Sequence, residues 1–212
     1  MGVPVTGGTD TGVATSAAET LDDGTPMAST RQWLSKRQSS TVQRLLDAGV
    51  QCVRDEGYDQ LTVRSVAGRA GVTHTTAYAY FSSKGHLVAE MFWRRLLAVP
   101  TPAPDHLASL TERVTAALRG PGLVLADEPE LAQAALAAML TNDPEVCRVR
   151  DAVGADLARR IETALGAHAE PELTEAILLA FSGAMLHAGM GYFDFSGVIG
   201  RMASVARQLD RT

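Results

Sequence analysis

A short polar stretch, residues 73–80 (Thr-His-Thr-Thr-Ala-Tyr-Ala-Tyr), carries side chains well suited to binding chemistry. Its hydroxyl, imidazole and phenol groups form hydrogen bonds, and none of its residues is acidic. Hydroxyls near a helix N-terminus can meet phosphate oxygens, and the helix dipole favours an anion at the same end. The chemistry indicated is therefore hydrogen bonding to a nucleic-acid backbone and to base edges.

Two short helices and a tight turn are predicted to position these side chains. Thr62 is a suitable N-cap for a first helix, because apolar residues recur at helical spacing from Val63 to Ala70. Gly71 supplies the turn, since glycine adopts positive φ without steric cost. Thr73 is a suitable cap for a second helix that ends near Phe81. The pattern predicts a helix-turn-helix at about residues 62–81, whose second helix enters the DNA major groove.

The candidate DNA-binding residues are assigned to two groups. Those expected chiefly to hold phosphates are Thr62, Thr73, Thr75, Tyr78 and Lys84, and those expected to face base edges are His74, Thr76 and Tyr80. Arg64 completes the DNA-binding set. Each of these residues taken singly also suits an ordinary polar helix face, so the prediction depends on the whole constellation.

A long ordered pattern runs through residues 57–87: Gly-Tyr, Leu-Thr-Val-Arg, Val-Ala, Ala-Gly-Val-Thr, Thr-Thr-Ala-Tyr-Ala-Tyr-Phe, Ser-Lys and His-Leu. It closely resembles the DNA-binding domain of TetR-type transcriptional regulators, and the resemblance extends over about residues 38–97. The resemblance implies an all-helical homodimer whose C-terminal domain binds a small molecule and thereby releases DNA. Ala77 stands where the family usually has a larger apolar residue, which implies looser packing. Ala79 stands where a longer side chain is common, which removes one possible DNA contact.

The charge distribution agrees with a nucleic-acid partner, although the overall net charge is −5. Residues 31–96 hold ten basic and five acidic residues, a net charge of +5, whereas residues 97–212 hold nine basic and fifteen acidic residues, a net charge of −6. The positive charge therefore coincides with the predicted DNA-binding helices, as phosphate neutralisation requires.

The sequence favours a DNA-binding protein over an enzyme. It contains no Gly-x-Ser-x-Gly, no His-Glu-x-x-His, no Cys-x-x-Cys and no phosphate-binding glycine loop, so we expect neither catalysis nor a cofactor nor a metal site. No signal peptide is visible, and the longest charge-free apolar run, residues 176–190, is too short and too interrupted to span a bilayer. We expect a soluble, cytoplasmic protein.

The chain divides into three parts. Residues 1–33 have few large apolar side chains and are expected to be a disordered tail. Residues 34–99 form the helix-turn-helix domain, and three prolines between positions 100 and 104 mark its end. Residues 103–212 are expected to form a helical domain for effector binding and dimerisation. Within it, Gly120-Pro121-Gly122 is expected to end one helix, and Asp143-Pro144 to begin another.

The sequence indicates the residues of the effector site less clearly than those of the DNA-binding surface. Pockets between helices are mostly apolar with a few polar groups, and the candidates by position are His106, Met139, Met185, His187, Met190 and Phe193. Such residues are also common in ordinary cores and interfaces. The apolar composition suggests an apolar effector. The predicted function is a repressor that is released from a palindromic operator when the effector binds. Two alternatives stay open. The protein could be a DNA-binding regulator without a small-molecule effector, controlled by a protein partner, or it could act as an activator.

Overall fold

The computed structural model describes residues 36–103 and 109–209. Within these ranges the chain is helical and contains no strand, which confirms the all-helical prediction. The predicted tail at residues 1–33 and the candidate effector residue His106 lie outside the described residues.

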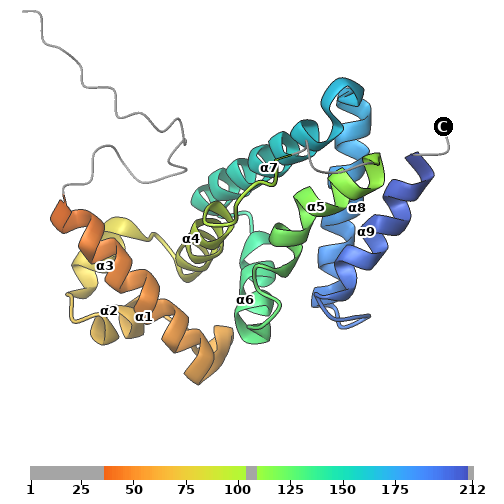
Figure 1. The fold of residues 1–212 in the computed structure, drawn as a ribbon. Helices are drawn as coiled ribbons and strands as arrows, with labels where there is room; N and C mark the ends of the chain where they lie inside the picture. The colour runs from red at the N-terminus through yellow and green to blue at the C-terminus, as the bar shows by residue number, and fades with distance from the viewer. Residues whose placement is uncertain (1–35, 104–108, 210–212) are drawn as a thin grey trace, which may run out of the picture.

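Four helices form the N-terminal part (Figure 1): α1 Lys36–Gln60, α2 Val63–Arg69, α3 His74–Tyr80 and α4 Lys84–Leu97. Gly57 interrupts α1 with a φ of 78°, a conformation that favours glycine. Because α1 changes direction at this point, its last residues lie close to the start of α4.

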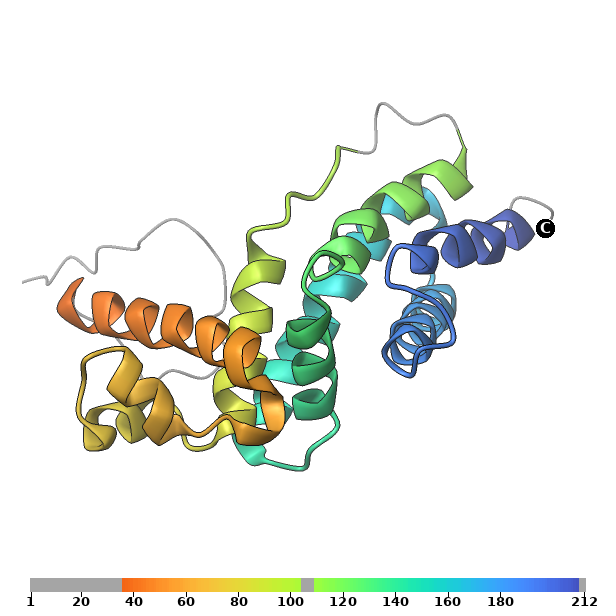
Figure 2. The ribbon, with the colours of Figure 1, turned by 90° about the horizontal axis from the view of Figure 1, so that it is seen from below.

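The C-terminal part contains α5 Leu110–Leu123, α6 Pro129–Met139, α7 Pro144–Leu165, a 3-10 turn Gly166–His168, α8 Pro171–Gly189 and α9 Gly197–Leu209. Two views show α8 and α9 at the end of the molecule opposite α1–α3 (Figures 1 and 2). Asp143 caps α7, with Pro144 as its first residue, as predicted.

The prediction that Gly120-Pro121-Gly122 ends a helix is wrong. Pro121 lies inside α5, which continues to Leu123. A proline inside a helix removes one backbone hydrogen bond and crowds the carbonyl four residues earlier. Pro121 and Gly122 are both buried, and a Cβ atom on Gly122 would lie 2.8 Å from Ile199 of α9. The close packing of α5 against α9 therefore decides the conformation.

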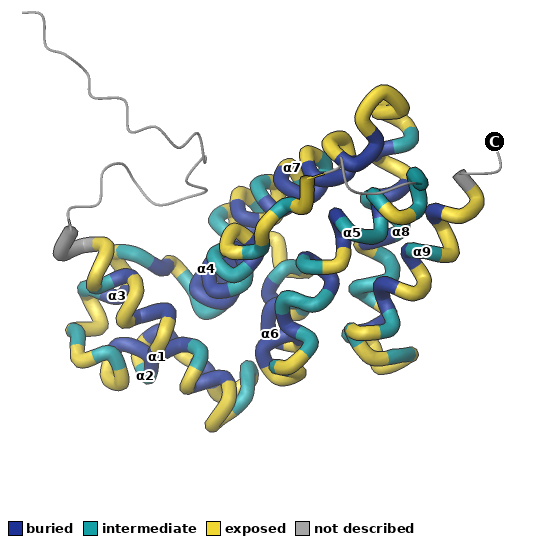
Figure 3. The backbone as a smooth tube through the Cα atoms, in the orientation of Figure 1, coloured by how far each residue is buried: buried dark blue, intermediate teal, exposed yellow. Residues whose placement is uncertain are grey.

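Helix α4 is largely buried (Figure 3) and belongs to both hydrophobic cores that the described residues form. Leu87, Val88 and Met91 pack with α1–α3 and with α6 in one core, whereas Trp93 and Leu96 pack with α5, α7, α8 and α9 in the other. A single rigid helix thus connects the helix-turn-helix to the interior of the C-terminal part.

Glu128 makes a second connection at the start of α6. Its carboxylate accepts hydrogen bonds from Arg54 of α1 (Nη2–Oε2, 2.5 Å) and from Arg95 of α4 (Nη1–Oε1, 2.5 Å). Partial burial opposes ionisation, but the two arginines outweigh it and hold the pKa of this carboxyl below its usual value of 4.5. The ionised Glu128 therefore ties three helices together at neutral pH.

Replacing Glu128 with glutamine is expected to lower the free energy of unfolding at pH 7 by about 1 kcal/mol, because a half-exposed ion-pair network is lost. A depressed folded-state pKa stabilises the protein above the unfolded-state pKa, and this stabilisation disappears as the pH falls through the folded-state value. The difference between wild type and E128Q in urea unfolding should therefore shrink below about pH 4.5. Glu130→Gln, at an exposed residue of the same helix, is the control. An equal loss in both variants would contradict the assignment.

Candidate DNA-binding surface and effector cavity

Local hydrogen bonds shape the helix-turn-helix as the sequence predicts. Thr62 caps α2 and forms a reciprocal capping box with Ser65. Gly71 forms the turn with a φ of 66°. Thr73 caps α3, and its Oγ1 accepts a hydrogen bond from the backbone N–H of Thr76 at 3.1 Å. The recognition helix α3 therefore begins at His74.

One face of α3 packs on the core and the other faces solvent. Ala77 is completely buried, and Phe81, directly after the helix, is buried beside His86 with ring centroids 5.6 Å apart. His74, Thr75 and Tyr78 are exposed. This division leaves an imidazole, a hydroxyl and a phenol on the outward face of the recognition helix.

The remaining predicted DNA-binding residues differ in how free their side chains are. Arg64 is exposed and makes no ion pair with any described residue. Thr62 and Thr73 are exposed but use their hydroxyls as helix caps. Thr76 is half-buried and shares a hydrogen bond with Thr73, and Tyr80 is half-buried against the core. Arg64 and the three exposed residues of α3 thus have side chains that are not engaged in holding the fold.

Lys84 has a structural role that the sequence did not indicate. Its Nζ donates to the backbone carbonyls of Tyr58 (3.1 Å) and Asp59 (3.2 Å), and it lies 4.6 Å from the centre of the Tyr58 ring. The ammonium group therefore caps the kinked end of α1 and joins it to the start of α4. The prediction of a phosphate contact by Lys84 stays a prediction.

The first turns of α4 and α7 meet at a pair of helix caps. Ser83 caps α4, and its hydroxyl donates to Oδ2 of Asp143 at 2.5 Å. Asp143 caps α7 by accepting from the backbone N–H of Glu145 at 2.9 Å. The hydrogen bond from Ser83 is the main cause of a lowered pKa for the Asp143 carboxyl. This contact joins the DNA-binding part to the C-terminal part through residues 60 positions apart, a pairing that no local pattern indicates.

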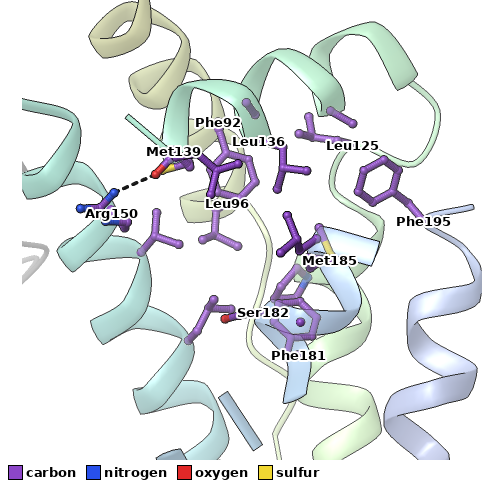
Figure 4. A pocket seen from close by; sticks show the side chains of 18 of the residues that line it. Phe92, Leu96, Leu125, Leu136, Met139, Arg150, Phe181, Ser182, Met185 and Phe195 are labelled. Atoms are coloured by element: carbon purple, nitrogen blue, oxygen red, sulfur yellow. Dashed lines mark hydrogen bonds between the residues drawn. The ribbon is translucent and has the colours of Figure 1, made fainter. Parts of the chain in front are cut away.

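An apolar cavity of about 420 Å³ lies among the helices of the C-terminal part (Figure 4). Its walls include side chains from five helices, α4 to α8: Phe92, Leu96, Pro121, Leu136, Met139, Val153, Leu157, Phe181 and Met185. Arg150 is the single charged residue in the described lining, and it is exposed to solvent at the edge of the cavity. The arrangement suits a molecule that is mostly apolar.

Two of the six predicted effector residues, Met139 and Met185, line this cavity. The other described candidates lie elsewhere: His187 contacts the ring of Tyr192 at 5.2 Å, Met190 is 60% exposed, and Phe193 lies under the guanidinium of Arg201 at 3.4 Å. On α8 the cavity is lined by residues between 179 and 186, whereas Met190 and Phe193 come after the helix ends. The candidates are predicted because they lie in apolar stretches of the sequence. Such a stretch does not indicate which face of the helix lines the cavity.

The described residues contain no helix long and apolar enough to cross a membrane, and no cluster of potential metal ligands. The fold and the exposed face of α3 define a helix-turn-helix transcriptional regulator with a helical C-terminal domain. Residues 45–91 match the family described as bacterial regulatory proteins, tetR family.

The relatives agree with this match. The chain is 42% identical over 173 residues to an uncharacterized HTH-type transcriptional regulator of Mycobacterium tuberculosis (strain ATCC 25618 / H37Rv), covering 81% of each chain. The chain therefore belongs to the TetR family. It is a DNA-binding regulator, not an enzyme.

Two solved structures show the same fold. A TetR transcriptional regulator from Rhodococcus sp. RHA1 has a TM-score of 0.65 and 20% identity, covering 81% of this chain and 95% of that one. The transcriptional regulator FadR from Bacillus subtilis, solved in complex with stearoyl-CoA, has a TM-score of 0.54 and 16% identity, covering 77% and 96%.

Proposed function

We propose that this regulator is a cytoplasmic repressor that binds a palindromic operator and is released when a small apolar molecule enters the C-terminal cavity. One observation supports the release mechanism above all. Phe92 and Leu96 of α4 line the cavity, while Leu87 and Val88 of the same helix pack in the core of the DNA-binding part. An occupant therefore contacts the helix that positions the recognition helix.

The proposed DNA contacts follow the exposed face of α3. His74 is assigned to base edges, together with Thr76 and Tyr80. Thr75 and Tyr78 are assigned to phosphates, together with Arg64, Thr62, Thr73 and Lys84. The capping hydroxyls Thr62 and Thr73 lie at the N-termini of α2 and α3, where the helix dipole favours phosphate.

We propose a homodimer formed through α8, α9 and the segment between them. Large apolar side chains are exposed in this region: Leu179 by 65%, Met190 by 60% and Tyr192 by 75%. Exposed large apolar side chains in one region are typical of a protein interface. A dimer also supplies the two recognition helices needed to read two half-sites one helical turn apart.

The effector is proposed to be a molecule with a long apolar chain. The cavity walls are almost entirely hydrocarbon, and the structurally similar FadR of Bacillus subtilis was solved with stearoyl-CoA. The cavity supports the small-molecule proposal over the alternative of a regulator controlled by a protein partner without a small molecule.

The test begins with footprinting of the purified protein on the DNA flanking its own gene. We expect a protected near-palindrome, and added lauroyl-CoA should abolish the protection. If the DNA stays protected in the presence of every apolar ligand tested, the effector proposal is rejected, but the assignment of the operator stands. Binding that is indifferent to DNA sequence and weak at low salt would reject the repressor proposal itself.

A further inference from the structure

Arg150 has an unusual position among the arginines of α7. Arg148 pairs with Glu145 at 2.6 Å, and Arg159 and Arg160 both pair with Asp156 on the same helix. Arg150 makes no ion pair with any residue that the structure describes. It is thus a cation without a neutralising carboxylate in its described surroundings, placed at the edge of an apolar cavity.

The guanidinium of Arg150 is held by backbone and sulfur atoms instead. Its Nη1 donates to the carbonyls of Met139 (2.8 Å) and Thr141 (3.2 Å), and its Nη2 contacts Sγ of Cys147 at 3.2 Å. Figure 4 shows the side chain directed to Met139 at the edge of the cavity. These three contacts leave two of the five N–H donors of the guanidinium for another acceptor. A charged group with spare donors suits an anion.

We propose that Arg150 binds the anionic head group of an amphiphilic effector whose apolar chain occupies the cavity. This inference rests on the proposed small-molecule function and specifies the chemical class: an apolar chain ending in a carboxylate or phosphate. Apolar walls alone accept any chain of suitable size, whereas the guanidinium selects for negative charge. Arg150 is therefore the specificity-determining residue of the site.

The same residue connects the cavity to the DNA-binding part. Arg150 fixes the carbonyls of Met139 and Thr141 where α6 ends, and two residues later Asp143 accepts the hydrogen bond from Ser83 at the start of α4. An anion bound to the two remaining donors pulls on the guanidinium and weakens its hydrogen bonds to those carbonyls. The segment 140–143 then shifts, and the shift reaches α4 through the Ser83–Asp143 contact. Head-group binding, beyond filling of the cavity, thereby promotes DNA release.

The first experiment compares dodecanoate, lauroyl-CoA and 1-dodecanol on the full-length protein by isothermal titration calorimetry. We expect the wild type to bind the two anions about 10- to 100-fold more tightly than the alcohol, as hydrogen bonds between charged groups allow. Arg150→Gln should remove this preference and leave 1-dodecanol binding unchanged. Arg148→Gln, an exposed arginine two positions away outside the cavity, is the matched control and should behave as wild type.

The outcomes separate the two proposals. Equal binding of anions and alcohol by the wild type, or a preference that survives in R150Q, overturns the role of Arg150 but leaves the apolar effector in place. Failure of all three ligands to bind the wild type overturns the effector proposal itself. Loss of preference for both anions supports recognition of any anionic head, and loss for lauroyl-CoA alone assigns the contact to the phosphates. If R150Q fails to fold, R150K, which keeps the charge, should retain the preference in weakened form, and equal binding of anions and alcohol by R150K would overturn the proposal.

A second variant tests the connection to α4. Ser83→Gly removes the hydrogen bond to Asp143, while glycine at an N-cap costs only a few tenths of a kcal/mol of helix stability. We expect S83G to bind dodecanoate as tightly as wild type but to need a several-fold higher concentration to leave the footprinted operator. Unchanged release would exclude the Ser83–Asp143 contact as the route.

Discussion

His74→Ala is expected to weaken operator binding at least about 30-fold and to relax specificity at one position of each half-site. His74 is the first residue of the recognition helix and is exposed. A lost base contact costs about 1–3 kcal/mol, and the proposed homodimer loses it twice, so the expected cost is about 2–6 kcal/mol per dimer. Fluorescence anisotropy with a panel of single-base operator variants measures both effects.

Tyr78→Phe provides the contrast within the same helix. It removes one hydroxyl assigned to phosphate, so it should weaken binding uniformly across operator variants. The salt dependence should stay unchanged, because a neutral phenol neutralises no phosphate charge. Thr163→Val removes an exposed hydroxyl of α7, outside the DNA-binding surface and the proposed dimer interface, and serves as the control for surface hydroxyls. If H74A and Y78F both bound every operator variant like wild type, the assignment of this surface would be wrong.

Arg160→Leu is expected to lower the free energy of unfolding by about 3 kcal/mol, because the buried carboxylate of Asp156 loses its buried partner and keeps only the exposed Arg159. Arg160 is 2% exposed and its Nε lies 2.6 Å from Oδ2 of Asp156. Its Nη2 also donates to the carbonyls of Leu96 (3.3 Å) and Val99 (2.9 Å) at the end of α4. Urea denaturation at neutral pH measures the loss.

Two further variants identify the cause. Arg159→Leu removes an exposed partner of the same carboxylate and should cost less than about 1 kcal/mol. The double variant Asp156→Leu/Arg160→Leu removes both buried charges and should recover part of the stability lost in R160L. A double variant less stable than R160L would show that the carbonyl contacts of α4, and not the stranded carboxylate, dominate the loss.

The helix-turn-helix was predictable because its determinants are local. The caps at Thr62 and Thr73 and the turn at Gly71 involve backbone atoms only three or four residues away. They can therefore be predicted from the amino-acid sequence. The apolar spacing from Val63 to Ala70 similarly indicates which face of α2 is buried. The expectation of looser packing around Ala77 stays a prediction, and the structure shows this residue completely buried in the core.

The local pattern of residues was enough to predict the fold class, the position of the recognition helix and the type of its exposed side chains. The lining of the cavity was not predictable in full, because its walls come from five helices whose faces are set by mutual packing. Tertiary packing also brings Lys84 to the end of α1, Ser83 to Asp143 and Arg150 to the edge of the cavity. Caps and turns form between neighbours in sequence, whereas these contacts form only after distant helices have packed.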